Sequence, residues 1–335
     1  MDAIDAWETK WTVKASAEEL SQLHYIKTRH PISLDDTNKH YITSNEYMVC
    51  EKTDGKNAVF FFVPQVGVFV SDRTREVKKL ASEGQPLACP CLIHVIVEAE
   101  IVASTVQNRI EIWMYDCLRI HNNTNATSTL NLKERLAQLH LFFIAYLKNS
   151  DFMKHLGANI YVKEFFDVKS YNHLLAKITS FIGGQNEHLY GTQLDDSSLV
   201  HANDGVIFTP VQTYASSRIG SDLPILKLKQ QETIDFQYQM CENSQRHKLL
   251  VTVDVTESTL NHFQFNGCYA YLISSEQNDD LHNKILECVH MRGQQPSGNL
   301  WKIHRIRTDK NSPNTITTAQ RIMKLIANRF DEYKF

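Results

Sequence analysis

The sequence predicts an α+β protein with two domains, a larger mixed domain followed by a smaller all-β domain. At 335 residues, the chain is longer than a single hydrophobic core usually organises. Its first two thirds combine Val- and Ile-rich runs with helical stretches, whereas short strand candidates recur at fairly regular spacing from about residue 230. Such spacing is typical of a small sandwich or barrel. We therefore expect domains at 1–229 and 230–314, with a last helix at 315–335 that packs back on the first domain.

The composition argues against a membrane-spanning, secreted or disulfide-rich protein. Hydrophobic residues make up 42% and charged residues 22% of the chain, which is ordinary for a globular protein. No apolar run approaches the roughly 20 residues of a membrane span, and the N-terminus lacks the pattern of a signal peptide, so an intracellular protein is expected. The seven cysteines are scattered, which does not indicate a disulfide framework. The net charge of −3 leaves room for a local basic groove.

The first domain contains both helix and strand signals. Ser16 and Glu19 form a capping box that opens a helix through about residue 29, which Pro31 ends. Apolar residues at helical spacing predict helices over 132–148 and over 169–182, the second stopped by a glycine pair. The strand candidates are 58–63, 66–70, 92–102, 109–118, 204–208 and 224–229.

The second domain contains only strand signals until its end. Polar turns separate the strand candidates 236–240, 249–255, 268–274, 285–291 and 301–307. Residues 317–333 then return to helical periodicity.

A lysine beside a tight turn is the central feature of the first domain. Lys52 lies three residues before Gly55, with Asp54 between them. The apolar run at 58–63 that follows must be buried, so we expect Lys52 at a strand end or turn that faces a cleft. The neutral amine of a lysine is a nucleophile, and nearby positive charge or desolvation favours that form. The alternative is a charged turn between two strands.

Later residues provide partners for such a lysine. Lys227 and Lys229 alternate on a strand candidate, which puts both amines on one face. Arg305 and Arg307 alternate in the same way and present planar donors suited to phosphate. The acidic residues in or after strand candidates, which can hold a divalent metal and ribose hydroxyls, are Glu98, Glu100, Asp116 and Asp204. This set outlines a phosphoryl or nucleotidyl transfer site.

The order and content of these segments resemble the messenger-RNA capping enzyme guanylyltransferases, in the covalent nucleotidyltransferase superfamily that also contains DNA and RNA ligases. The segments that resemble the family's motifs I, III, IIIa, IV, V and VI are 30–34 with 47–55, 98–102, 113–116, 204–208, 226–229 and 301–314. Two positions depart from the family pattern. Asn57 stands where motif I usually has a ribose-contacting arginine, and Glu98-Ala99 stands where motif III has Asp-Gly.

The resemblance implies a fold and a reaction. The fold is a nucleotidyltransferase domain of antiparallel sheets with packed helices, similar to ligases and ATP-grasp enzymes, plus an OB-fold β-barrel. In that family the motif I lysine attacks the α-phosphate of GTP and releases pyrophosphate, and the lysine-bound GMP passes to the 5′-diphosphate end of RNA as a GpppN cap. By this resemblance Lys52 is the nucleophile. Lys227 and Lys229 hold the α-phosphate and favour the neutral amine, and Asp204 assists deprotonation or metal placement.

The resemblance also implies how the nucleotide is held. Glu100 contacts ribose, and Tyr115 and Ile207 sandwich guanine. Cations of the second domain reach the β- and γ-phosphates only when that domain closes. The complete nucleotide-binding set is Thr53, Asp54, Gly55, Glu100, Tyr115, Asp116, Ile207, Arg305, Arg307, Asp309 and Lys310.

The implied cofactor is Mg²⁺ or Mn²⁺, with Asp204 as its candidate ligand, and the implied substrate is GTP. The implied partners are 5′-diphosphate RNA, a separate RNA triphosphatase and the phosphorylated C-terminal tail of RNA polymerase II, without a membrane. The nucleus is the expected compartment, or the cytoplasm for a viral protein. Two alternatives stay open: an ATP-dependent RNA or DNA ligase, and a catalytically degenerate member that binds RNA ends, which Asn57 favours.

Overall fold

The structure is a computed structural model in two compact units, residues up to 228 and residues from 229 on. The described residues are 3–23, 28–72, 76–104, 109–120, 129–182, 188–193, 200–213, 222–229, 232–239, 247–252, 262–271, 281–290, 300–308 and 310–327. Among these, no helix has both the length and the apolar character needed to cross a bilayer.

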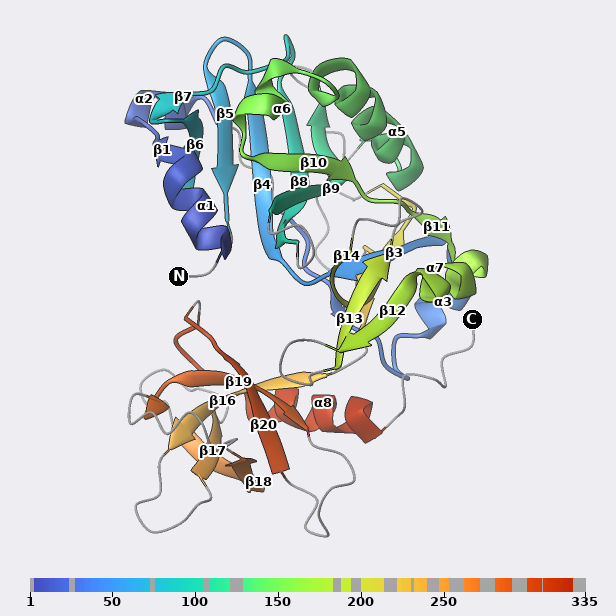
Figure 1. The fold of residues 1–335 in the computed structure, drawn as a ribbon. Coiled ribbons are helices and arrows are strands. Elements are labelled where there is room, and N and C mark those ends of the chain that lie inside the picture. Colours follow the sequence, from blue (N-terminus) through green and yellow to red (C-terminus); the bar gives the residue numbers. More distant parts are fainter. Residues whose placement is uncertain are drawn as a thin grey trace. The chain divides into compact units, whose positions relative to one another are not determined.

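An eight-stranded sheet forms one half of the first unit (Figure 1). Its strands follow the order β1-β6-β5-β4-β8-β9-β10, with β7 paired to β6. Neighbouring strands are antiparallel except for the parallel pair β9 and β10. The strands are β1 (Thr12–Lys14), β4 (Lys56–Val63), β5 (Gly67–Ser71), β6 (Val77–Ser82), β7 (Gln85–Pro86), β8 (Val95–Ala103), β9 (Ile110–Ile120) and β10 (Ala158–Val162).

The side chains of β4 point alternately into two hydrophobic clusters, which explains how both faces of this sheet are buried. Phe60 and Phe62 belong to the main core, whereas Phe61 and Val63 belong to a smaller cluster. Successive side chains of a strand point to opposite faces, so the continuous apolar run covers both faces, as predicted. The helical segments that contribute side chains to the main core are α1 (Ala3–Trp11), α5 (Leu132–Phe142) with its π-helical end η1 (Phe143–Leu147), and α6 (Asp151–His155).

A second, seven-stranded sheet holds the lysine strand β3. Its order is β11-β3-β14-β13-β12, and β15 pairs with both β14 and β2. The strands are β2 (Ile32–Ser33), β3 (Tyr47–Thr53), β11 (Phe166–Asp167), β12 (Ile178–Ile182), β13 (His188–Gln193), β14 (Val200–Pro210) and β15 (Leu226–Leu228). The remaining helical segments of this unit are α2 (Ala17–Ser21), α3 (His40–Ser44), η2 (Val168–Ser170) and α7 (Tyr171–Lys177).

Two predicted helices differ from the observed ones. The capping box of Ser16 and Glu19 is present as predicted, but α2 ends at Ser21, and residues 24–27 lie outside the described part of the chain. The helix predicted over 169–182 was wrong in its second half. Its chain leaves the helix at Lys177 and continues as β12, because Ile178, Thr179 and Ile182 are β-branched residues that favour a strand paired with β13.

The second unit contains the predicted OB-fold barrel. Five strands close in the order β16-β17-β18-β20-β19, so the fifth strand lies between the third and the fourth. Only the pair β18 and β20 is parallel. This is the five-stranded Greek-key arrangement of an OB-fold, which confirms the prediction. The strands are β16 (Thr233–Gln239), β17 (His247–Thr252), β18 (His262–Tyr271), β19 (Ile285–His290) and β20 (Leu300–Ile306).

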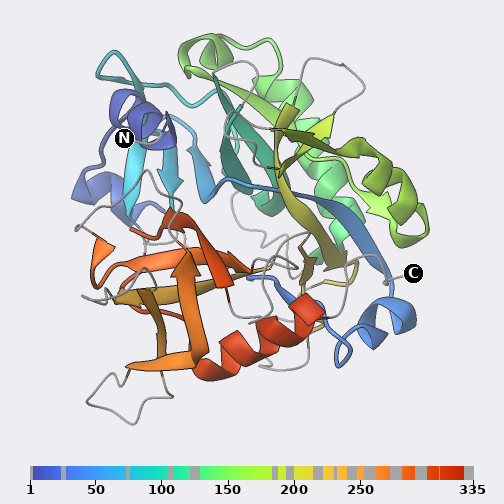
Figure 2. The same ribbon diagram turned by 60° about the horizontal axis from the view of Figure 1, so that its bottom comes forward.

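The last helix packs on the barrel of its own unit, whereas the sequence predicted that it packs back on the first domain. Helix α8 (Ile316–Ala327) contacts β16 and β17, and Figure 2 shows it beside the barrel strands. Its Ala319 and Ile326 join Phe236 and Trp301 in one core cluster. The helix therefore adds its apolar face to the core of the barrel. Residues 328–335 lie outside the described part.

Candidate active site

Lys52 is the penultimate residue of β3, and its amine meets a carboxylate from the neighbouring strand. The Lys52 Nζ donates a hydrogen bond to Asp204 Oδ2 at 2.5 Å, and the side chains are 17% and 21% exposed. Strand β14 pairs Asn203 with Thr53 and Val206 with Glu51, so Asp204 and Gly205 together lie opposite Lys52. This is a β-bulge, and Gly205 supplies its positive φ of 122°. The bulge turns Asp204 toward the lysine and keeps both groups accessible.

The turn after Lys52 is held against β8. The backbone N–H of Gly55 donates to Glu100 Oε1 at 3.3 Å, and that of Asp54 donates to Ala202 O at 2.9 Å. A Cβ on Gly55 would lie 2.5 Å from Ile101 O and 2.9 Å from the Glu100 side chain. Only glycine allows the two segments to approach this closely. The predicted residues Lys52, Gly55 and Glu100 are therefore close together.

A buried lysine that the sequence analysis did not identify completes this part of the site. Lys163 Nζ donates to Thr53 Oγ1 at 2.7 Å and to Glu100 Oε2 at 3.0 Å, and Thr53 Oγ1 also donates to Glu100 Oε2. Burial raises the pKa of Glu100, but the charges of Lys163 and Lys52 and the Thr53 hydrogen bond outweigh it, so the net pKa is lowered. Burial lowers the pKa of Lys163, but the Glu100 charge reverses this. Glu100 and Lys163 are therefore held as an ion pair.

Tyr115 also lies at a β-bulge. Strand β8 pairs Glu98 with Asp116 and Ala99 with Met114, which leaves Tyr115 as the extra residue of β9. Its hydroxyl accepts a hydrogen bond from Asn57 Nδ2 at 2.5 Å, and the Lys163 ammonium lies 5.4 Å from its ring centre. Burial, reinforced by nearby carboxylates, raises the pKa of Tyr115 well above its usual value, so the phenol stays neutral. Asn57 thus orients the aromatic ring that the sequence analysis proposed for base stacking.

Ile207 and Lys227 are paired across β14 and β15. They are direct Cα partners, and Ile207 is also the partner of Cys50 on β3. Partners in antiparallel strands point to the same face, as do Cys50 and Lys52 two residues apart. Ile207 and Lys227 are partly exposed, while their strand neighbours Val206, Phe208, Leu226 and Leu228 are buried. The sheet therefore presents Lys52, Ile207 and Lys227 on one partly accessible face.

Asp116, which was predicted to contact the nucleotide, has a buried structural partner. Its carboxylate is 4% exposed, and both oxygens accept from Arg135 of α5, at 2.7 and 2.9 Å. Arg135 is fully buried and also donates to Leu130 O at 3.0 Å. Because this carboxylate is already bound by a buried guanidinium, the structure gives Asp116 a structural role, and its contact with the nucleotide stays a prediction.

Beside this pair, Glu98 is buried, with 7% of its surface exposed. Burial, together with repulsion from Asp116, raises its pKa from 4.5 to about 8, against the opposing effect of Arg135. Between these two pH values, Glu98 therefore keeps its proton in the folded chain but has lost it in the unfolded chain. We expect the contribution of this group to the free energy of unfolding to be complete below about pH 4.5 and to be lost as pH rises through about 8.

Urea unfolding at several pH values measures this dependence. The Glu98→Gln variant should give a flatter stability profile across the same window, because an amide does not titrate. A Glu98→Gln profile as steep as the wild-type profile would show that another group causes the slope.

The motif VI cations of the second unit are held by two buried carboxylates. Asp235 and Glu287 are direct partners across β16 and β19 and are each 5% exposed. Arg305 Nε donates to Glu287 at 2.6 Å, Arg307 Nη1 donates to Asp235 at 3.0 Å, and Lys310 Nζ also donates to Asp235. Burial raises the pKa of Glu287, but Arg305, Thr233 and Lys229 outweigh it, so the net pKa is lowered. Asp309 lies outside the described residues.

Lys229 belongs to this second unit, whereas its predicted companion Lys227 belongs to the first. The predicted residues therefore form two groups, one around Lys52 in the first unit and one around the barrel cations in the second.

Among the described residues, few side chains are grouped so that they could bind a metal ion together. No group of three or more His, Cys, Asp or Glu side chains gathers among them. Mg²⁺ typically keeps several waters and is held by one or two carboxylates plus substrate phosphates. Asp204, partly exposed beside Lys52, fits that pattern as a single carboxylate ligand.

Comparison with known families agrees with this geometry. The mRNA capping enzyme catalytic domain matches residues 13–231, and the mRNA capping enzyme C-terminal domain matches residues 226–335. The chain belongs to the mRNA capping enzyme family. The resemblance inferred from the motifs is thus confirmed. The two matches meet close to the boundary between the two units.

Individual capping enzymes are distant relatives. An mRNA-capping enzyme of Caenorhabditis elegans is 23% identical over 325 residues, which cover 90% of this chain and 47% of that protein. The chain therefore spans about half the length of this relative. An mRNA-capping enzyme subunit alpha of Eremothecium gossypii is 22% identical over 356 residues, covering 86% of this chain and 72% of that protein. Among solved structures, a mycobacterial DNA ligase D complexed with ATP and MES has 11% identity and a TM-score of 0.43, covering 85% of this chain and 95% of that chain.

Proposed function

We propose that this chain is an mRNA guanylyltransferase, which forms a covalent lysine–GMP intermediate and transfers GMP to the 5′-diphosphate end of RNA. The observation that carries the proposal is the pair of Lys52 and Asp204. A partly exposed amine lies 2.5 Å from a carboxylate at a bulge, in a chain of the capping enzyme family. A nucleophile within hydrogen-bond reach of a base is the arrangement that covalent catalysis requires.

In the proposed first step, the Lys52 Nζ attacks the α-phosphorus of GTP. A P–N bond forms while the bond between the α-phosphorus and the bridging oxygen breaks, and pyrophosphate leaves. The amine must lose a proton to attack, and Asp204 Oδ2 is the acceptor within reach. In the second step, the terminal phosphate of 5′-diphosphate RNA attacks the same phosphorus and releases Lys52.

The surrounding residues support nucleotide binding. Lys227, on the same face as Lys52, is the proposed contact that neutralises the α-phosphate. Glu100, fixed by Thr53, Gly55 and Lys163, offers carboxylate oxygens to the ribose hydroxyls. Tyr115 and Ile207 are the proposed base-stacking pair, with Asn57 fixing the tyrosine ring. This arrangement gives Asn57 a role in place of the usual arginine.

A divalent metal and the second unit complete the proposal. Mg²⁺ or Mn²⁺, held by Asp204, would offset charge on the phosphates. Arg305, Arg307 and Lys310 are the proposed contacts for the β- and γ-phosphates, where a phosphate would compete with Asp235 and Glu287 for the cations.

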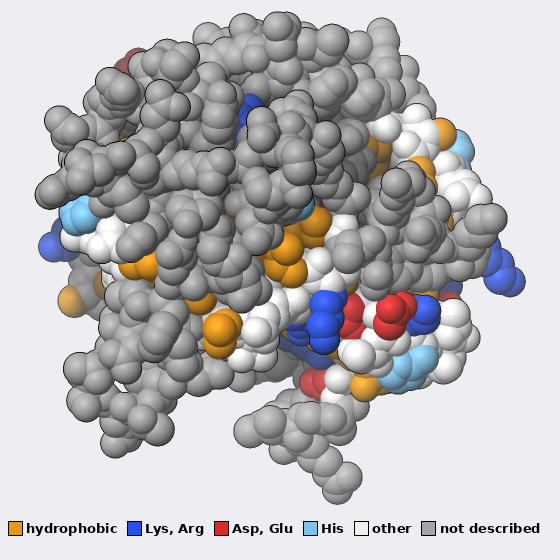
Figure 3. All heavy atoms as spheres, turned by 90° about the horizontal axis from the view of Figure 1, so that it is seen from below, with side chains coloured by type: hydrophobic (Ala, Val, Ile, Leu, Met, Phe, Trp, Pro, Cys, Tyr) orange, Lys and Arg blue, Asp and Glu red, His pale blue; other side chains and the backbone are white. Residues whose placement is uncertain are grey.

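The partners also remain proposals. RNA with a 5′-diphosphate end implies a separate triphosphatase activity that supplies it. On the face shown in Figure 3, described basic side chains lie beside acidic ones. Docking of a phosphorylated polymerase tail and location in the nucleus stay predictions.

Labelling with α-³²P nucleotides tests the function. We expect the chain, incubated with Mg²⁺ or Mn²⁺, to gain a covalent label from GTP but not from ATP. Pyrophosphate should remove the label, and 5′-diphosphate RNA should accept it as a cap. A label from ATP alone would replace the proposal with an RNA or DNA ligase, and no label from either nucleotide would indicate a degenerate member that only binds RNA ends.

A further inference from the structure

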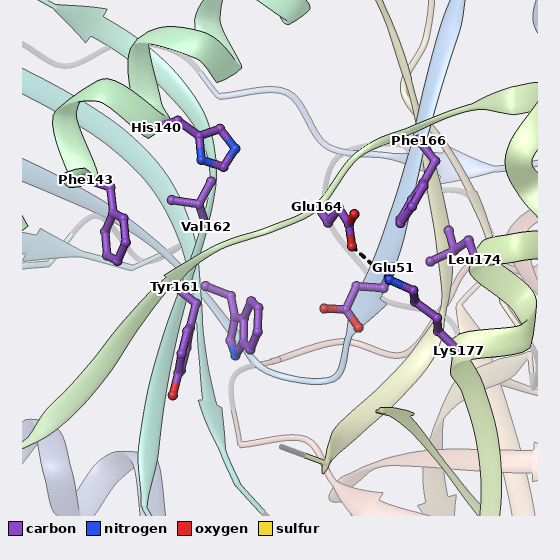
Figure 4. A pocket seen from close by; sticks show the side chains of 10 residues that line it. Glu51, His140, Phe143, Tyr161, Val162, Glu164, Phe166, Leu174 and Lys177 are labelled. Carbon is purple, nitrogen blue, oxygen red and sulfur yellow. Dashed lines mark hydrogen bonds and ion pairs between the residues drawn. The ribbon is translucent and has the colours of Figure 1, made fainter. Parts of the chain in front are cut away.

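Two cavities in the described part of the first unit are lined by none of the residues predicted to bind the nucleotide. Figure 4 shows the first, a space of about 310 Å³ with Phe143, Tyr161 and Phe166 around it and with Lys177 paired to Glu164. Its lining side chains include no thiol. The second cavity, of about 370 Å³, has one in its wall, and the proposed reaction does not use it.

The second cavity lies between a loop and two helical segments. Residues 87–90, which lead from β7 to β8, form its loop side, and Tyr146 of η1 with residues 150–152 and 155 at α6 forms its other side. Cys89 belongs to this loop, lines the cavity and is partly exposed. The volume is at the lower end of the range for small-molecule sites, so a small reagent can reach this thiol.

A second thiol lies beside Cys89. The sulfur atoms of Cys89 and Cys91 are 3.4 Å apart, and Cys91 is 2% exposed in the main core. A disulfide bond is about 2.05 Å long, so a shift of roughly 1.4 Å brings the two sulfur atoms to bonding distance. The Cys91 sulfur also lies 3.1 Å from the backbone oxygen of Ile93, which accepts its S–H when Cys89 keeps its own proton.

The two thiols differ in acidity. The hydrogen bond from the Cys91 thiol lowers the pKa of Cys89, and the Cys91 backbone N–H adds to this against the opposing effect of burial. The same hydrogen bond, together with burial, raises the pKa of Cys91. Because the thiolate is the nucleophile, Cys89 is the attacking thiol and Cys91 is the one that resolves a mixed disulfide.

The other described cysteines lie in the interior. Burial raises the pKa of Cys50 and that of Cys117 to about 12 in each case. Cys288 is fully buried. Buried, protonated thiols are inert. Among the described cysteines, Cys89 is therefore the one that combines exposure with a lowered pKa.

We propose that Cys89 and Cys91 form a thiol–disulfide exchange site that low-molecular-weight disulfides, such as oxidised glutathione, oxidise reversibly. The Cys89 thiolate attacks one sulfur of the reagent, so that a mixed disulfide forms, the bond between the two reagent sulfurs breaks and one thiolate leaves. Cys91 gives its proton to that thiolate and attacks the Cys89 sulfur.

The second reagent sulfur then leaves as a thiolate and takes up the proton that Cys89 had released to the solvent. The pair of cysteines loses two electrons, and the reagent is reduced to two thiols. Excess thiol reverses both steps, which makes the modification reversible.

Incubation of the folded chain with oxidised glutathione, followed by thiol blocking, trypsin digestion and mass spectrometry, tests the proposal. Both cysteines fall between Lys79 and Arg109, so a single tryptic peptide carries them. We expect this peptide to lose two hydrogen atoms at least about tenfold faster than the peptides with Cys50 or Cys117 react. Excess reduced glutathione should restore it. Absence of the disulfide, or equally fast reaction of Cys117, would overturn the proposal.

Two variants separate the roles of the thiols. Cys91→Ser should stop the reaction at the mixed disulfide of Cys89 with glutathione, because no resolving thiol remains. Cys89→Ser should leave Cys91 unmodified, because that side chain is buried. The matched control, Cys117→Ala, changes a fully buried cysteine of β9 and should react as the wild type does. A glutathione adduct on Cys91 in Cys89→Ser, formed as fast as the wild-type disulfide, would contradict the assignment.

A measurement on the wild-type chain keeps the test independent of how the variants fold. With limiting iodoacetamide, Cys89 should be alkylated before Cys117 in the folded chain, and this preference should disappear in urea. A preference that persisted in urea would come from the local sequence and would overturn the site. None of these outcomes depends on labelling of Lys52 by GTP.

Discussion

Replacing Lys52 with arginine should abolish the covalent label from GTP, with a loss of at least about a thousandfold. Arginine keeps the positive charge and can still pair with Asp204, but a guanidinium does not lose its proton in proteins and cannot act as the nucleophile. The variant therefore separates the chemical role of the amine from its electrostatic role. Labelling with α-³²P GTP, followed by electrophoresis, measures the effect.

The matched control is Lys154→Ala. Lys154 is a 69% exposed lysine of α6 that pairs with Asp151 in its own helix. This variant should label as the wild type does. Urea unfolding should show that Lys52→Arg is folded, because the 17% exposed amine is not part of the core. A labelled Lys52→Arg protein would place the nucleophile on another side chain and remove the central assumption of the proposed function.

The position of Lys52 could be predicted because several local constraints agree. The apolar run of β4 had to be buried, and the glycine three residues after Lys52 indicated a tight turn; the structure adds that a Cβ on Gly55 would clash with β8. These constraints put the lysine at the end of a strand, which the structure confirms. The barrel was predictable for a similar reason, since its short strands are separated by polar turns.

The two bulges are the features that strand periodicity could not predict. A bulge adds one residue to one strand of a pair, so it becomes visible only when both strands and their register are known. Gly205 beside Asp204 is a weak signal for the first bulge, because an isolated glycine in a strand often marks one. Tyr115 has no such neighbour. Motif resemblance identified both residues, and the bulges explain how they can face the site.

The buried charged residues also differ in whether the sequence alone reveals them. Arg135 falls at helical spacing on the face that also carries Leu132, Leu136 and Leu139, so a charge on an apolar stripe was visible in the sequence. Its partner Asp116 lies on β9 and is found only in three dimensions. Lys163 has no comparable signal, because it stands just after the short strand β10, between Val162 and the exposed Glu164.

The pair of Arg135 and Asp116 should be the ionic interaction on which the stability of the first unit depends most. Arg135 is fully buried, binds both carboxylate oxygens and connects α5 to β9. It also lies close enough to Glu98 to oppose the rise in the pKa of that carboxyl. Removing one partner of a buried pair leaves an uncompensated charge in a medium that solvates it poorly.

Arg135→Met should therefore lower the free energy of unfolding by about 3–5 kcal/mol, measured by urea unfolding near neutral pH. The double variant Arg135→Met with Asp116→Leu should recover much of this loss, because it removes both charges and retains an apolar contact of similar volume. Lys133→Ala is the matched control on the same helix, since its ion pair with Glu46 is solvent-exposed and should contribute far less. Equal losses in the single and the double variant would mean that packing of the arginine side chain, rather than its charge, joins α5 to the sheet.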